Sequence, residues 1–282
     1  MDPSSVLLTD KVAVITGGGD GIGKGIALTY AKFGAHIVIA DLNPAAGEAV
    51  AQQVRALGRK GLAIATDVRN REQVQAMVQR TVAELGGVDI LVNNAGGVRP
   101  KEFMDMDEAR WRRSVELNLI GLFNCTHAAA REMIVAGRGG AIINISSIEG
   151  SRAGPLYSVY SACKAGMENF TRTTALELSR HRIRVNSIAP DMIDTPHTAE
   201  LHTPQAQQAI ARVIPLGRMG TTEDVAGAAV YLASDLAAWV TGINLHVDGG
   251  TWASGGWIRQ GDSWTLFPDS TGVVDSPKQS GG

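Results

Sequence analysis

Short apolar runs rich in β-branched residues recur along the chain, and stretches with apolar residues at helical spacing separate them. Strands that alternate with helices favour right-handed parallel crossovers, and uninterrupted apolar strands indicate a sheet covered on both faces. The pattern therefore predicts a doubly wound, parallel α/β sheet. The predicted strands cover residues 12–16, 36–40, 61–66, 89–93, 141–145, 183–188 and 244–247.

The stretch 70–85 is a representative helix between two of these strands. Val74 and Met77 repeat at helical spacing, whereas Asn70 and Gln73 suit an N-cap and the third helical position. A second helix is predicted directly after residue 23. The chain shows no internal repeat and no linker before residue 250. We therefore expect one domain over residues 1–250.

Composition narrows the class of protein. Of the 282 residues, 33 are glycine, 44% are hydrophobic and 19% are charged, which excludes a disordered, collagen-like or coiled-coil chain. With 26 basic and 28 acidic residues, the net charge is −2. Such a balance predicts neither a nucleic-acid partner nor a polybasic membrane surface.

The two cysteines, Cys125 and Cys163, form neither metal-ligand spacing nor a disulfide framework. Residues 1–11 lack the basic segment and apolar run of a leader, and no uncharged apolar stretch reaches the eighteen residues that span a bilayer. The sequence thus predicts a cytoplasmic protein with no metal site and no membrane partner.

A glycine-rich loop, residues 16–23, joins the first strand to the following helix. A bound dinucleotide pyrophosphate needs a tight turn, close backbone approach and a free helix N-terminus. Gly17, Gly21 and Gly23 can supply these three features. An ordinary glycine-rich turn is the alternative interpretation.

Asp41 follows the second strand, eighteen residues after Gly23. A carboxylate there accepts hydrogen bonds from an adenosine ribose and repels a 2′-phosphate, which favours NAD over NADP. Asp20 adds a second negative charge, and Leu42 offers no basic group. The alternative role for Asp41 is to cap the helix that starts at Pro44.

Tyr160 and Lys164 lie four residues apart, on one face of a predicted helix. At roughly 5 Å, the lysine charge would favour the phenolate by about 3 kcal/mol. Tyr160 is therefore a candidate general base near neutral pH.

With these motifs in this order, the chain resembles the short-chain dehydrogenase/reductase family over about residues 8–250. The resemblance implies strand order 3-2-1-4-5-6-7 and a mobile substrate lid at about 192–215. It also implies a homotetramer assembled through helices at about 107–135 and 157–178. The matching motifs are residues 16–23, 67–68, 93–96, Asn118, Ser147, Tyr160 with Lys164, 190–195 and 247–250.

The resemblance assigns the catalytic residues. Tyr160 would exchange a proton with the substrate oxygen, and Ser147 would hydrogen-bond that oxygen. Lys164 would lower the pKa of Tyr160 and bind the nicotinamide ribose. Asn118 would hold a water that links Lys164 to solvent, and its alternative interpretation is a polar residue that interrupts a helix.

The resemblance also assigns a cofactor shell, in which residues 67–68 would receive the adenine. In one place the chain departs from the family, because Asp191 replaces the usual glycine after Pro190. The expected cofactor-binding residues are Gly17, Asp20, Gly21, Ile22, Gly23, Asp41, Leu42, Asp67, Val68, Asn94, Ala95, Gly96, Tyr160, Lys164, Pro190, Ile193 and Thr195.

Together these features predict NAD-dependent interconversion of a secondary alcohol and a ketone, and the substrate itself is not specified. The alternatives are a 3-oxoacyl-carrier reductase, which would prefer NADPH, and a protein that binds NAD without turnover. A sugar-nucleotide epimerase is disfavoured because the glycine spacing from Gly17 to Gly23 differs from that class.

Residues 251–282 form an extension beyond the predicted domain. They hold three of the five tryptophans of the chain: Trp252, Trp257 and Trp264. We expect residues 251–268 to pack on a subunit, near a neighbour's active site, because so much aromatic surface is unfavourable in water. Residues 269–282 have the composition of a flexible end.

Overall fold

The computed structural model describes residues 2–266, and the seven predicted strands are all present. They form one parallel sheet in the order β3-β2-β1-β4-β5-β6-β7, so the expected fold is confirmed. The strands are β1 (Val12–Thr16), β2 (His36–Asp41), β3 (Gly61–Ala65), β4 (Ile90–Asn93), β5 (Gly140–Ile145), β6 (Ile183–Pro190) and β7 (Asn244–Val247).

Helices cover both faces of this sheet. On β1, Ala13 and Ile15 pack with α1, α2 and α8, whereas Val14 packs toward α3, α5 and α6. Both faces are dry because successive strand residues point to opposite sides. The α-helices are α1 (Gly21–Lys32), α2 (Pro44–Ala56), α3 (Arg71–Leu85), α4 (Glu108–Val115), α5 (Gly121–Ala136), α6 (Ser158–Ser179), α7 (Pro204–Val213), α8 (Thr222–Ala233) and α9 (Thr251–Ser254).

Helix α3 begins and ends where its sequence predicts. The side chain of Asn70 accepts hydrogen bonds from the backbone N–H groups of Glu72 and Gln73, at 3.0 and 3.1 Å. The Gln73 side chain accepts instead from the backbone N–H of Asp67, at 2.8 Å. It thereby fixes the loop that follows β3.

The long helix expected over 107–135 is divided. A π-helical turn, η3 (Glu116–Ile120), separates α4 from α5 while the backbone stays in the right-handed helical region. Such turns insert a residue into the helix and often mark functional sites. Here the inserted turn carries Asn118.

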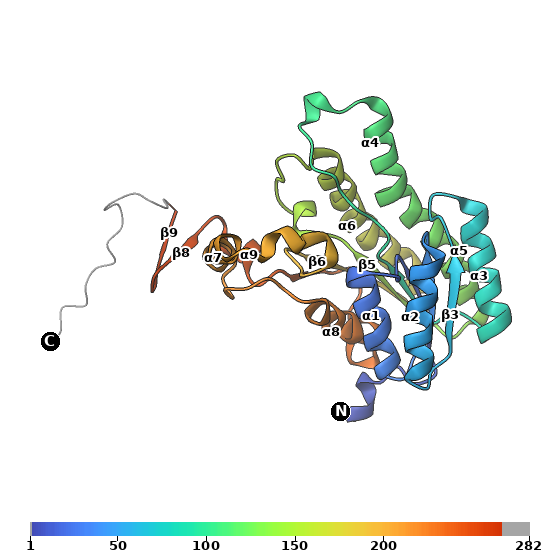
Figure 1. The fold of residues 1–282 in the computed structure, drawn as a ribbon. Helices are drawn as coiled ribbons and strands as arrows, with labels where there is room; N and C mark the ends of the chain where they lie inside the picture. The colour runs from blue at the N-terminus through green and yellow to red at the C-terminus, as the bar shows by residue number, and fades with distance from the viewer. Residues whose placement is uncertain (1, 267–282) are drawn as a thin grey trace.

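The extension starts with α9 and continues as an antiparallel hairpin of β8 (Ile258–Gln260) and β9 (Ser263–Thr265). Figure 1 places this hairpin beyond α7, away from the sheet. Trp252 stacks on His246 at a centroid distance of 5.2 Å, and Trp252, Trp257 and Trp264 are all exposed. The predicted docking on another subunit stays a prediction, and the flexible end predicted for 269–282 lies outside the described residues.

None of the helices within residues 2–266 is long and apolar enough to cross a membrane. The same part of the chain contains no cluster of histidine, cysteine and acidic residues that could hold a metal ion.

Candidate active site

A cavity of about 580 Å³ lies at the carboxyl ends of the parallel strands. In doubly wound sheets this edge is where ligands bind, since the loops on either side of it diverge. Most of the residues expected from the sequence meet here. Those that line the cavity are Gly17, Asp20, Gly21, Ile22, Asp41, Leu42, Asp67, Val68, Asn94, Ala95, Gly96, Ser147, Tyr160, Lys164, Pro190 and Thr195.

The glycine loop has the backbone that a phosphate cradle requires. Gly17 and Gly21 adopt positive φ angles of 62° and 52°, which residues with a side chain rarely adopt. A Cβ on Gly23 would overlap the Gly17 carbonyl, so the start of α1 packs tightly beneath the loop. Asp20 caps α1 and accepts a hydrogen bond from the backbone N–H of Gly21, at 2.7 Å.

Asp41 is held at the entrance to this loop. One carboxylate oxygen accepts from the backbone N–H of Gly19 and the other from that of Asn43, both at 2.8 Å. The N-cap of α2 is Asn43, so the alternative capping role for Asp41 is wrong. The Asp41 carboxylate thus lines the cavity beside the glycine loop.

Two asparagines after β4 have separate structural tasks. Asn93 is buried, and its amide donates to Asn144 at 2.9 Å and to Thr126 at 3.0 Å, which joins β4 to β5 and α5. The Asn94 amide donates to the carbonyls of Thr16 and Gly17, at 3.0 and 2.9 Å. Asn94 thus supports the glycine loop from below and also lines the cavity.

Tyr160 and Lys164 project from α6 into the same cavity as Ser147, which lies just after β5. The Lys164 ammonium lies 5.4 Å from the centre of the Tyr160 ring and donates to the Ile145 carbonyl at 2.6 Å. Ser147 donates to the Glu149 carboxylate at 2.5 Å. Two neighbouring segments, α6 and the loop after β5, therefore supply the candidate reactive groups.

Burial dominates the proton affinities of this cluster. It raises the pKa of Tyr160 to about 12, against a smaller lowering by the Ser147 hydroxyl and a further rise caused by Glu149. Burial lowers the pKa of Lys164 to about 8. The expected fall in the pKa of Tyr160 is therefore wrong, because loss of solvent on burial is the largest influence on this phenol.

Asn118 stands behind this cluster and does not line the cavity. Its side-chain oxygen accepts from the backbone N–H of Gly97 and its amide donates to the Gly97 carbonyl, both at 3.0 Å. A Cβ on Gly96 would collide with the Asn118 oxygen. The π-helical turn thus fixes the loop after β4 against α6.

Asp191 brings a carboxylate to the cavity wall, as its place after Pro190 suggested. Burial raises the pKa of this carboxyl group, and the Arg152 guanidinium lies 3.7 Å away. Arg152 also pairs with Glu149 at 3.0 Å. An ion-paired cluster therefore flanks the Ser147 side of the cavity.

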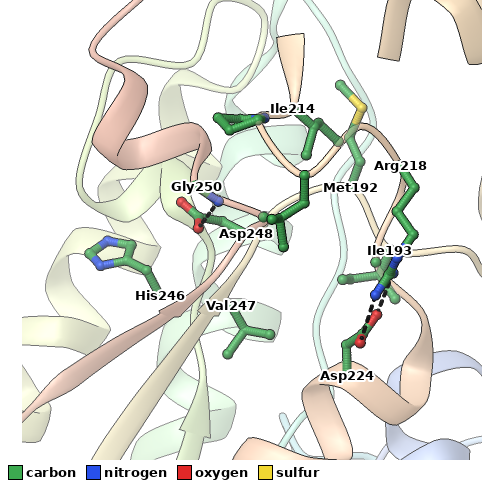
Figure 2. Close-up of a pocket in the computed structure, with 13 residues that line it drawn as sticks. Met192, Ile193, Ile214, Arg218, Asp224, His246, Val247, Asp248 and Gly250 are labelled. Carbon is green, nitrogen blue, oxygen red and sulfur yellow. Dashed lines mark hydrogen bonds and ion pairs between the residues drawn. The ribbon is translucent and has the colours of Figure 1, made fainter. Parts of the chain in front are cut away.

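Ile193 is the expected cofactor residue whose side chain lies elsewhere. It lines a second cavity of about 450 Å³ (Figure 2), together with Met192, Ile214 and Val247. There the ion pair between Arg218 and Asp224 closes one side, at 2.7 Å. Any contact of Ile193 with a nicotinamide would have to use its backbone.

Several cavity residues were missed by sequence reasoning. They lie at or shortly after the carboxyl ends of β2, β3 and β5 or on the neighbouring π-helical turn, and this place at the ends of the strands was the available signal. His197 also lines the cavity, and its imidazole lies 3.9 Å from the Asp20 carboxylate. The missed residues are Ala40, Thr66, Arg69, Leu117 and Ile145.

Comparison with known proteins identifies the family to which this chain belongs. A family profile described as enoyl-(acyl carrier protein) reductase matches residues 17–251. A 3-oxoacyl-(acyl carrier protein) reductase of Chlamydia muridarum is 42% identical over 245 residues, which cover 86% of this chain and 98% of that protein.

Two solved structures share the fold. A short-chain type dehydrogenase/reductase from Mycobacterium marinum is 38% identical, with a TM-score of 0.82 over 88% of this chain and 98% of that one. A 7α-hydroxysteroid dehydrogenase complexed with NADH and 7-oxoglycochenodeoxycholic acid is also 38% identical, with a TM-score of 0.84 over 89% and 97%. This chain therefore belongs to the short-chain dehydrogenase/reductase family of oxidoreductases.

Proposed function

We propose that this protein interconverts a secondary alcohol and a ketone with NAD as cofactor. The observation that carries the proposal is the shared cavity. The phenol of Tyr160, the hydroxyl of Ser147 and the ammonium of Lys164 open onto the same space as the glycine loop. A proton-transferring group and a dinucleotide site are thus adjacent, as hydride transfer with proton exchange requires.

The residues present fit a nicotinamide dinucleotide. The positive φ angles of the glycine loop and the N-terminus of α1 suit a pyrophosphate. Such a cofactor supplies or accepts the hydride at the substrate carbon. The chain itself moves the proton: Tyr160 takes it from the alcohol hydroxyl and returns it in the reverse direction. Ser147 would hydrogen-bond the same oxygen, exchanging its contact with Glu149 for the substrate.

Lys164 has an electrostatic task in this scheme. Its charge, 5.4 Å from the Tyr160 ring, stabilises the phenolate that accepts the proton. Because burial raises the pKa of Tyr160 to about 12, this assistance is required at neutral pH. Lys164 would also hold the nicotinamide ribose, since its ammonium faces the cavity.

Asp41 supports NAD rather than NADP. Two backbone N–H groups fix its carboxylate at the edge of the cavity, where it would meet the ribose hydroxyls of NAD and repel a 2′-phosphate. The relative solved with NADH is consistent with this preference.

A second candidate activity is reduction of a 3-oxoacyl group on a carrier protein. It is favoured by the 42% identical reductase of Chlamydia muridarum and by the matching family profile. The same proton and hydride transfers would serve that substrate. The Asp41 carboxylate argues against it, because such a reductase would prefer NADPH.

The test is an assay of hydride transfer followed at 340 nm. Oxidation is measured with NAD or NADP and a panel of secondary alcohols that includes cyclic and steroidal ones. Reduction is measured with 3-oxoacyl thioesters and the reduced cofactors. We expect turnover of an alcohol with NAD, and Tyr160→Phe should lower kcat at least 100-fold. Tyr231→Phe is the matched control, because that side chain is exposed on α8 and away from the cavity.

Each result supports or excludes one of the candidate functions. Full activity of Tyr160→Phe would refute the proposed mechanism. Preference for NADPH and an acyl thioester would favour the reductase. Tight NAD binding with no turnover across the panel would favour a protein that binds the cofactor without chemistry.

A further inference from the structure

Glu168 is a buried carboxylate that the proposed reaction does not use. It lies on α6 one helical turn beyond Lys164, so Tyr160, Lys164 and Glu168 follow one another at four-residue spacing on the same face. Only 4% of Glu168 is exposed. A buried acidic side chain is costly unless its oxygens are hydrogen-bonded, so its partners are informative.

Both partners come from the loop that carries Ser147. The Ser146 hydroxyl donates to one Glu168 oxygen at 3.1 Å. The Ser151 hydroxyl contacts both Glu168 oxygens, at 3.2 and 3.0 Å. Ser146 precedes Ser147 and Ser151 follows it by four residues, so one carboxylate holds the two ends of this short loop.

The loop is shaped around that carboxylate. A Cβ added to Gly150 would overlap a Glu168 oxygen, so the absence of a side chain there lets the loop close over α6. Between the two ends, residues 148–150 form the 3-10 turn η4, which Ser147 caps. Ser147 therefore has its backbone fixed from α6, the helix that also carries Tyr160 and Lys164.

Ser151 extends the contact to the edge of the sheet. Its hydroxyl lies 3.3 Å from the Asn244 amide and 3.3 Å from an imidazole nitrogen of His246, both on β7. The loop is thus tied on one side to α6 and on the other to the last strand. Movement of either tie would displace Ser147 relative to Tyr160.

We propose that Glu168 is a positioning residue that clamps the 146–151 loop to α6 and so sets the position of the Ser147 hydroxyl relative to Tyr160. The effect on turnover rests on the proposed function, whereas the clamp itself does not. Both serine hydroxyls hydrogen-bond this one side chain, so its loss would release both ends of the loop. A misplacement of about 1 Å at a reacting group can cost about 100-fold in rate.

Two substitutions distinguish the hydrogen bonds of Glu168 from its charge. Glu168→Ala removes both oxygens, and we expect kcat to fall about 10- to 100-fold while KM for NAD changes less than twofold. Glu168→Gln keeps one acceptor and adds an amide donor for the other serine, so kcat should stay within about threefold of the wild type. Glu177→Gln is the matched control, because that side chain is exposed on the same helix.

Amide hydrogen exchange of the ligand-free chain tests the clamp without any turnover. We expect faster exchange in residues 146–152 of Glu168→Ala, with α1 and α3 unchanged, and near-normal exchange in Glu168→Gln. Should Glu168→Ala fail to fold, Ser151→Ala removes one tie, and exchange in the same segment should still accelerate.

The turnover and exchange results can each support or overturn the proposed role of Glu168. Wild-type kcat and exchange in Glu168→Ala would overturn the proposal, as would faster exchange spread evenly over the molecule. A Gln variant as slow in turnover as the Ala variant would also overturn it, because charge rather than the clamp would then be responsible. If the wild type turns over no substrate, the proposed function fails, and the exchange pattern still decides on the clamp.

Discussion

Replacing Lys164 by methionine should change the pH dependence of stability as well as abolish turnover. Lys164 is 4% exposed, and its ammonium has one hydrogen bond, to the Ile145 carbonyl. Burial lowers its pKa to about 8 from the model-peptide value of 10.5. The folded chain therefore holds this proton less tightly than the unfolded chain does.

The sign and size of the effect follow from linkage. Below pH 8 both states are protonated, and burial of the charge costs the folded state about 3 kcal/mol. Between pH 8 and 10.5 the unfolded state binds more protons, so stability rises with pH. Between pH 7 and 9.5 this one group should add about 2 kcal/mol to the free energy of unfolding of the wild type. Lys164→Met lacks the group and should lack the rise.

The assay is urea unfolding followed by circular dichroism, with both proteins at one fixed concentration, at pH 7, 8, 9 and 9.5. The quantity of interest is the difference between wild type and variant, because shared titrations cancel. We expect the variant to be at least as stable at pH 7 and to lose about 2 kcal/mol of relative stability by pH 9.5. Lys32→Met, at an exposed position of α1, should show a pH-independent difference.

A constant difference between wild type and Lys164→Met over this range would refute the reasoning. So would a variant that gains relative stability as the pH rises. The first result would mean that the pKa of the ammonium is the same in the folded and unfolded chain, and the second that folding raises it.

Three further predictions concern the pH profile, the cofactor and the assembly. The Glu149 charge raises the pKa of Tyr160. In a plot of the alcohol oxidation rate against pH, Glu149→Gln should therefore move the rising part of the curve to lower pH by about 0.5 to 1 unit. A shift to higher pH would contradict this. Asp41→Ser should raise kcat/KM for NADP about five- to tenfold by removing a repulsion of roughly 1 kcal/mol, and an unchanged NADP rate would argue against that repulsion. Sedimentation of the full chain should give a tetramer, and deletion of residues 251–282 should lower its stability or activity; a fully active and equally stable truncated protein would contradict the predicted docking.

Much of the fold was predictable because its signals are local. The first strand and α3 begin and end where the apolar pattern and the Asn70 cap place them. Strand order came from the family resemblance, since apolar periodicity alone does not say which strands are neighbours. An interruption of the helix at Asn118 was raised only as the alternative interpretation of that residue, because a π-helical turn depends on what its residues contact, here Gly97.

The reactive residues were recognisable for a related reason. Tyr160 and Lys164 share a helix face, so their spacing alone brings them together. Their proton affinities were not predictable, because burial depends on every element that packs around them. The lysine charge was expected to lower the pKa of Tyr160, whereas burial raises it.

By itself, the sequence determined the alternation of strands and helices, the glycine loop and the residue types of the site. Each depends on neighbours within a few turns or one strand. Only the tertiary structure decided that Ser146 and Ser151 meet the Glu168 carboxylate, that the Ile193 side chain faces a second cavity, and that Asp191 pairs with Arg152. These contacts join residues far apart in the chain, and their energies arise from the exclusion of water when the elements pack.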